Sequence, residues 1–162
     1  MAAPPGFVHP ASRHDVREAL AYFGPLATYG VRSVEMRHAV EPGTGGLVIA
    51  TLMVPGRIVL FEQAPSPWTF RGRLSPESVE CLRHGGAAVT VSRSRTVVEW
   101  PADTLRDFML MDGLMHEIGH HLIQHHTGKR TVRVMRTADH ELRADAFARA
   151  CRREWLCRAG AE

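Results

Sequence analysis

The sequence predicts a small α+β domain, and three features of the chain carry that prediction. Its 162 residues suffice for one domain with its own core, and 44% hydrophobic with 23% charged residues is an ordinary globular composition. Residues 31–61 are rich in apolar and β-branched residues and are interrupted by glycine and proline, which is typical of short strands. Residues 103–126 and 138–158 instead follow a helical spacing and contain no proline. We expect a short mixed or antiparallel sheet packed on these two helices.

The N-terminal half is expected to contain one helix and three strands. Residues 1–11 are rich in proline and alanine and are expected to be flexible, which leaves 12–162 as a single folded domain. A helix over 12–23 would end at Gly24-Pro25. Apolar or partly alternating stretches predict strands over 31–40, 47–54 and 57–61.

The turn before the second strand has a composition that also occurs in cofactor-binding loops. Residues 41–46 read Glu-Pro-Gly-Thr-Gly-Gly, which resembles the glycine-rich loop of folds that bind nucleotides or methyl donors. Such a loop should open a helix whose N-terminus meets the ligand. A strand-like apolar stretch follows here, so a hairpin turn is favoured.

The second half of the chain is expected to lead from a loop into the two long helices. Residues 64–73, rich in proline and tryptophan, predict a loop, and a helix should start at Ser75-Pro76 and end at Gly85-Gly86. Short strands are expected over 87–91 and 96–100, directly before the helix over 103–126.

Charge, cysteine content and hydropathy narrow the class of protein. The net charge of +3 comes from scattered arginines without interleaved aromatic residues, which favours a solvated surface over a nucleic-acid interface. Three cysteines without Cys-x-x-Cys spacing argue against a disulfide framework, and Cys151 is expected to pack as a small apolar residue. The chain lacks the start of a secretory signal and any apolar stretch near 18 residues, so we expect a cytoplasmic protein without a membrane span.

The helix over 103–126 carries the pattern His-Glu-x-x-His at residues 116–120. Four helical residues amount to about 400° of rotation and 6 Å of rise, so His116 and His120 project from one face. Two neutral imidazoles there can bind one zinc ion, with the Glu117 carboxylate able to reach its water. Because the flanking residues are apolar, the histidines should be largely buried and in need of partners. A metal site is therefore favoured over a helix with merely solvated histidines.

A zinc site needs a third protein ligand, and several residues after the motif could supply it. The candidates are His121, His125, His126, His140, Glu141 and Asp145. The spacing of His126 is that of metzincin peptidases, but Ile123 stands where that pattern needs a glycine, so the helix should continue and carry His126 away. Glu141 and Asp145 share a face of the helix over 138–158, where small alanines would allow close packing. Periodicity alone is equally consistent with exposed carboxylates that pair with neighbouring arginines.

A resemblance favours Glu141. Residues 141–148 read Glu-Leu-Arg-Ala-Asp-Ala-Phe-Ala and resemble the Glu-x-x-Ala-Asp-x-x-Ala segment of gluzincin metallopeptidases, including compact ImmA/IrrE-type and minimal gluzincins. The resemblance covers about residues 97–150. It implies a zincin-like domain in which Glu141 is the third zinc ligand. From its place on the same helix face, Asp145 could then accept a hydrogen bond from a ligand imidazole without binding the metal itself. The resemblance also implies that the strand over 96–100 borders the cleft and pairs with extended substrate.

The expected function is that of a zinc endopeptidase acting on a protein or peptide. Zinc lowers the pKa of its bound water to about 7, and Glu117 would act as general base. His140, Arg143 and Tyr29 are open candidates for the donor that stabilises the oxyanion. The alternatives are a catalytically silent zinc-binding module with a regulatory or structural role and, more distantly, a basic nucleic-acid-binding domain. Residues 1–86 match no motif, so the substrate stays open.

Overall fold

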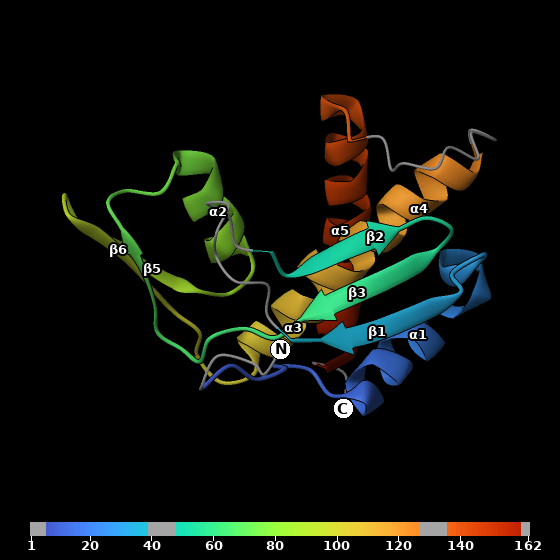
Figure 1. Cartoon of the computed structure of the whole chain (residues 1–162), viewed down its shortest axis with the longest axis horizontal. Coiled ribbons are helices and arrows are strands. Elements are labelled where there is room, and N and C mark those ends of the chain that lie inside the picture. Colours follow the sequence, from blue (N-terminus) through green and yellow to red (C-terminus); the bar gives the residue numbers. More distant parts are fainter. Residues whose placement is uncertain (1–5, 39–47, 127–135, 160–162) are drawn as a thin grey trace.

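The computed structural model describes residues 6–38, 48–126 and 136–159, and it confirms the α+β class. One three-stranded sheet lies over a long helical segment, the other three-stranded sheet lies to its left, and the C-terminal helix packs on that segment (Figure 1). The elements in chain order are α1 (Arg13–Thr28), β1 (Ser33–Arg37), β2 (Ala50–Met53), β3 (Arg57–Phe61), β4 (Trp68–Arg71), α2 (Pro76–His84), β5 (Ala88–Val91), β6 (Arg95–Glu99), α3 (Thr104–Phe108), the π-helix η1 (Met109–Met115), α4 (His116–His126) and α5 (Ala138–Ala159).

The first sheet has the order β1-β3-β2 and is mixed, with β1 parallel and β2 antiparallel to β3. Its central strand contains the apolar run Ile58-Val59-Leu60, and these three residues are buried, as their position between two neighbours requires. The strand β2 lies at the edge of the sheet and contacts α4. We call this sheet together with α1, η1, α4 and α5 the body.

The second sheet has the order β4-β6-β5 and is antiparallel throughout. Together with α2 it forms a unit that we call the lobe, residues 68–99, seen at the left of Figure 1. The buried cluster at this unit is partly aromatic: Trp68, Leu82, Ala87 and Val98 belong to the lobe, and Trp100 and Phe108 join them from the segment that follows it. The strand β4 was not expected, because the prolines and tryptophan of residues 64–73 predicted a loop.

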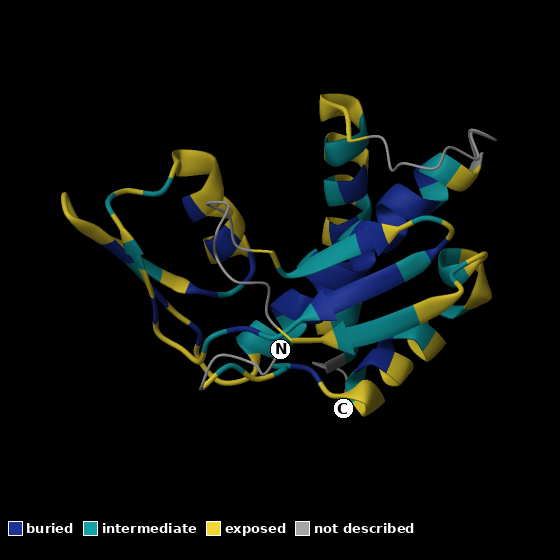
Figure 2. Cartoon of the chain, viewed as in Figure 1, coloured by how far each residue is buried: buried dark blue, intermediate teal, exposed yellow. Residues whose placement is uncertain are grey.

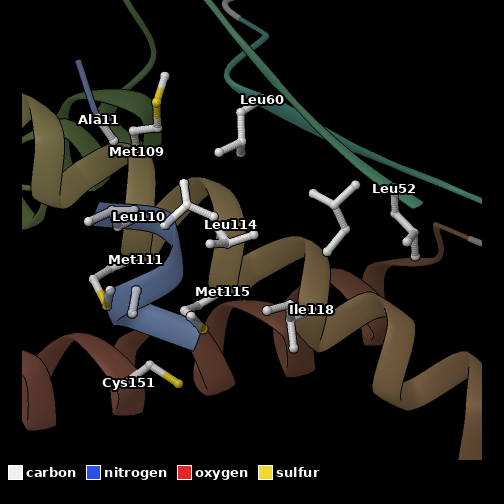
Figure 3. Packing of buried hydrophobic residues seen from close by; sticks show 13 residues of the cluster. Ala11, Leu52, Leu60, Met109, Leu110, Met111, Leu114, Met115, Ile118 and Cys151 are labelled. Atoms are coloured by element: carbon white, nitrogen blue, oxygen red, sulfur yellow. The ribbon is translucent and has the colours of Figure 1, made fainter. Parts of the chain in front are cut away.

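The helix expected over 103–126 is helical throughout but changes its winding. It is α-helical in α3, becomes a π-helix in η1 and returns to the α form in α4. The side chains of η1 lie between the first sheet and α5, where Met109, Leu114 and Met115 are fully buried (Figure 3). A π-turn widens the helix and often marks a functional site. Here it ends where the His-Glu-x-x-His segment begins.

The N-terminal part of the chain is joined to the body. Ser12 caps α1 in a capping box with Asp15, and the expected break at Gly24 is a kink with φ of 70°, beyond which the helix resumes to Thr28. Residues 1–11 were expected to be flexible; of these, 6–11 are described. Val8 forms an antiparallel bridge with Gln63, and Ala11 belongs to the core of the body.

The described residues also show where the cysteines and the other buried residues lie and whether any helix could span a membrane. Cys151 is buried in the core, as expected, and all three cysteines are free thiols. Buried residues gather on β3 and on the helices behind it (Figure 2). Within the described ranges no helix has the length and hydropathy to span a membrane. The glycine-rich turn over residues 41–46 lies outside the described residues.

Candidate metal centre

The site forms where α4 crosses α5 at very short range. Gly119 lies against Ala144, which is fully buried, and a Cβ atom built on Gly119 would stand 3.0 Å from the Ala144 Cα atom. No side chain larger than hydrogen fits at this glycine without moving α5. The crossing confirms that small alanines let the two helices approach, and it brings the N-terminal turn of α5 beside the two histidines.

Three side chains converge at this crossing and can hold a metal ion. The Nε2 atoms of His116 and His120 are 3.1 Å apart. The Glu141 Oε2 atom lies 3.2 Å from the His120 Nε2 atom and 3.3 Å from the His116 Nε2 atom. Ligand atoms placed tetrahedrally 2.0–2.1 Å from a zinc ion are about 3.3–3.4 Å apart. The triangle therefore has nearly the dimensions of one face of a tetrahedral site, and Glu141 lies where the sequence predicted it.

The orientation of the His116 ring is fixed by Asp145. The Asp145 Oδ1 atom is 2.9 Å from the His116 Nδ1 atom, so Nδ1 can donate its hydrogen there and leave the Nε2 lone pair facing the other ligands. Carboxylates hold metal-binding histidines in this way in many proteins. Asp145 thus makes the contact with a candidate ligand imidazole that the sequence suggested for it.

His120 is held as a neutral imidazole. It is 2% exposed, and its Nδ1 atom has no hydrogen-bond partner among the described residues. Burial first, and the neighbouring His116 second, lower the pKa of His120, with Glu141 acting in the opposite direction. The neutral form is the one that binds metals, so the electrostatics of the site favour ligation.

Glu117 lies beside the triangle and is not part of it. Its carboxylate is almost completely buried, at 4% exposure for the residue. The Oε2 atom accepts a hydrogen bond of 2.9 Å from the backbone N–H of Leu52 in β2. Both oxygens accept from the Arg136 guanidinium, at 2.8 and 2.9 Å. Glu117 is therefore held next to the ligands with its oxygens occupied by donors.

Arg136 is the site residue that the sequence analysis missed. Besides its bonds to Glu117, its Nη1 atom lies 3.6 Å from the Glu141 Oε1 atom and 3.5 Å from the His120 Nε2 atom. Burial alone would lower the pKa of the guanidinium, but the hydrogen bonds and charge of Glu117 outweigh it and raise that pKa. A signal did exist, because Arg136 precedes the start of α5, where the helix dipole disfavours a cation. A cation there calls for a carboxylate partner.

Other residues considered from the sequence lie elsewhere. The Tyr29 ring packs on His125, and the Tyr29 backbone oxygen accepts from His121 Nε2 at 3.0 Å, so His121 is directed toward the link between α1 and β1. Arg143 pairs with Asp139 on the same helix. The helix α4 continues to His126, as Ile123 predicted, but the His126 side chain lies outside the described residues.

A cavity of about 340 Å³ opens between β2 and the site. Its lining residues are Val48, Ile49, Ala50, Thr51, Asp112, Gly113, Glu117 and Arg136. The strand next to the site is thus β2. The expectation that the strand over 96–100 pairs with substrate is wrong, because β6 is the central strand of its sheet and has neighbours on both sides.

No protein-family model matches the chain, and comparisons with curated proteins and with solved structures found no match. The resemblance to gluzincins therefore rests on the two motif segments. The geometry defines a group of two histidines and one glutamate that could hold a metal ion.

Proposed function

We propose that this chain is a zinc-dependent endopeptidase in which His116, His120 and Glu141 bind the ion and Glu117 is the general base. The observation that carries the proposal is that, at the crossing of α4 and α5, the three candidate ligands are separate from the buried Glu117 carboxylate. Three candidate ligand atoms form a triangle with edges of 3.1, 3.2 and 3.3 Å, while a further carboxylate, that of Glu117, is buried beside that triangle and outside it. Two imidazoles and one carboxylate suit zinc, and they leave one position open for chemistry.

When bound, the ion would polarise a peptide carbonyl and lower the pKa of a water to about 7. Glu117 then accepts the proton of the attacking water and passes it to the departing amine. Its burial keeps bulk solvent away from that transfer, and the bond from Leu52 N–H fixes the position of the carboxylate. Arg136 must release at least one Glu117 oxygen before this exchange.

The edge strand β2 offers a way to hold an extended peptide. The backbone groups of Ile49 point toward β3, since its carbonyl accepts a hydrogen bond from Phe61 N–H. Those of Leu52 point away from β3, since its N–H donates to Glu117. The alternation along a strand therefore turns the polar backbone groups of Ala50 to the outer edge, beside the cavity. A peptide pairing there would lie next to Glu117, in the manner of strand addition.

The second candidate, a silent zinc-binding module, is favoured by one observation. Both Glu117 oxygens accept from Arg136, which would leave no free base if that pair persisted with metal bound. Both candidates include a cytoplasmic location, which fits the three free thiols.

The substitution Glu117→Gln separates the two candidates. Gln has the shape of Glu but cannot take up a proton, so the variant should retain zinc and lose about 10²–10⁴-fold of its cleavage rate. Zinc content is measured by elemental analysis, and cleavage with a peptide library at fixed zinc. Glu154→Gln, an exposed carboxylate on α5, is the matched control and should leave both unchanged. Undiminished cleavage by zinc-loaded Glu117→Gln protein refutes the general-base role.

A further inference from the structure

We propose that Arg136 is an internal counter-cation of the metal site: it holds Glu117 while the site is free of metal and opposes the binding of the divalent ion. The inference rests on the metal site of the proposed function, and it concerns a residue outside both motifs. It assigns Arg136 a positioning role that controls the metal affinity of the site and the availability of Glu117.

The contacts of one guanidinium carry the first step. Its Nη2 atom donates to both oxygens of Glu117, at 2.8 and 2.9 Å. Its Nη1 atom lies 3.6 Å from the Glu141 Oε1 atom and 3.5 Å from the His120 Nε2 atom. A single positive group thus contacts the buried carboxylate and two of the three ligand residues at once.

The second step is the sign of the electrostatic interaction. A fixed positive charge at this distance repels a divalent ion bound by His120 and Glu141. The Arg136 and Glu141 side chains are 39% and 40% exposed, so solvent screens this repulsion in part. Arg136 also neutralises the negative charge of Glu117, which would otherwise attract the ion. Both effects act in the same direction, so Arg136 weakens metal binding.

The third step is the formal charge of the whole group. Glu117, Glu141 and Asp145 contribute three negative charges, and Arg136 contributes one positive charge. Two negative charges remain uncompensated, which one divalent ion would neutralise. Arg136 therefore provides enough charge for a buried Glu117 to be tolerated without metal, and it leaves the site with an affinity for a dication.

These steps distinguish a counter-cation from a purely structural partner of Glu117. A structural ion pair would change only the stability of the fold when it is removed. A counter-cation also changes the metal affinity when it is removed, and in the direction of tighter binding. When the ion draws Glu141 and His120 to itself, the guanidinium loses their attraction, and Glu117 becomes able to exchange its arginine partner for water.

The test measures the affinity of full-length, chelator-stripped protein for Zn²⁺ by competition with a chromophoric chelator. Arg136→Gln should bind Zn²⁺ at least about tenfold more tightly than the wild type, because a repelling charge is removed. Arg136→Lys retains the charge and should stay within about threefold of the wild type. Arg153→Gln removes an equal charge from the exposed surface of α5 and should not change the affinity.

Thermal unfolding of the same proteins provides a second readout without activity. Metal-free Arg136→Gln should melt below the wild type, because Glu117 loses its partner, and Zn²⁺ should raise its melting temperature by more than it raises that of the wild type. If the buried charge prevents folding, Glu117→Gln compared with Glu117→Gln/Arg136→Gln isolates the direct repulsion: the double variant should still bind Zn²⁺ more tightly, by a smaller factor, and without an unpaired carboxylate.

The outcomes separate this inference from the proposed function. Unchanged or weaker Zn²⁺ binding by Arg136→Gln, or equal tightening by the Lys and Gln variants, overturns the counter-cation role. Tighter binding by Arg136→Gln in a protein that cleaves no peptide supports the inference and leaves the peptidase proposal unsupported. A wild type that binds no Zn²⁺ refutes both.

Discussion

The body and the lobe each bury one face of a three-stranded sheet, but they bury different chemistry. In the body, the buried set includes the ionisable residues Glu117, His120, His121 and Arg152. At the lobe, the buried cluster is apolar and aromatic. The rings of Trp68 and Trp100 meet edge to face in it, with their centroids 5.1 Å apart. Thr96 is the buried polar residue of the lobe, and its hydroxyl donates to the carbonyl of Gly72.

The difference shows that the body, unlike the lobe, buries groups that cost the fold stability. An ionisable group that is buried without partners destabilises a protein by several kcal/mol, so its presence needs a compensating role. In the body, the compensation is mutual: Glu117 pairs with Arg136, and His116 with Asp145. Because the lobe has no such set among its described residues, the proposed metal chemistry belongs to the body, and the lobe core serves packing.

Arg152 connects the two regions. It is buried, and its guanidinium contacts both the Asp112 carboxylate in η1 and the backbone oxygen of Gly85 at the end of α2. The body thus reaches the lobe through a charged side chain next to the π-helix. Substitutions in the lobe should still act on stability and leave the ligand atoms in place, which the following experiments examine.

The largest effect is expected when a ligand in the body is removed. His120→Ala should weaken Zn²⁺ binding about 1000-fold, because sites of this kind bind with roughly 10–16 kcal/mol in total and one of three protein ligands is lost. The measurement is the same chelator competition. His84→Ala, an exposed histidine in the lobe, is the matched control and should bind like the wild type. A comparable loss in that control would contradict the assignment of the site to the body.

Two corners of the candidate ligand triangle were predictable from local geometry, and the third was predicted from a resemblance. A separation of four residues on one helix aligns His116 with His120, and the gluzincin-like segment added Glu141. The alanines of α5 predicted the close crossing, which Gly119 and Ala144 make. The α+β class was equally accessible, since apolar spacing alone distinguishes the strands over 31–61 from the two long helices.

The rest of the site depends on tertiary contacts that periodicity does not encode. The bond from Leu52 N–H to Glu117 joins residues 65 positions apart, and Arg136 acquires its role only through the approach of α5 to α4. The strand over 96–100 was assigned to the substrate by resemblance, and sheet order overturned this, since order is set by long-range pairing. The π-helix could not be predicted from the sequence either, because its apolar residues fit an α-helical spacing.

An intermediate effect is expected in the lobe. Trp68→Ala should lower the free energy of unfolding by about 3 kcal/mol, because it removes a buried ring from the cluster with Trp100 and leaves a cavity. Chemical denaturation measures this loss, and Zn²⁺ affinity should stay within about twofold of the wild type. Trp68→Phe retains most of the ring contact and loses only the bond from Trp68 Nε1 to the Ala64 oxygen, so its loss should be smaller. A large fall in Zn²⁺ affinity with Trp68→Ala would show that the lobe core shapes the site.

The smallest expected effect is a dependence of the metal-free fold on pH, and it belongs to the body. Burial is the largest cause that lowers the pKa of His120 and of His121. The neighbouring His116 lowers the pKa of His120 further. For His121, the hydrogen bond to the Tyr29 backbone oxygen opposes the lowering. Both histidines therefore stay neutral in the folded chain at pH values where the unfolded chain, with a histidine pKa of about 6.5, already binds protons. Stability that is fully present above pH 6.5 should decrease as the pH falls through the range below it, by at most about 0.7 kcal/mol for each histidine between pH 6.5 and 6.0.

Denaturation of metal-free protein across this range measures the slope. His121→Gln can still donate to the Tyr29 oxygen but cannot titrate, so it should reduce the slope without abolishing it. A slope that His121→Gln leaves unchanged would mean that His121 does not couple folding to pH, and the dependence would then have to come from His120 or from other groups.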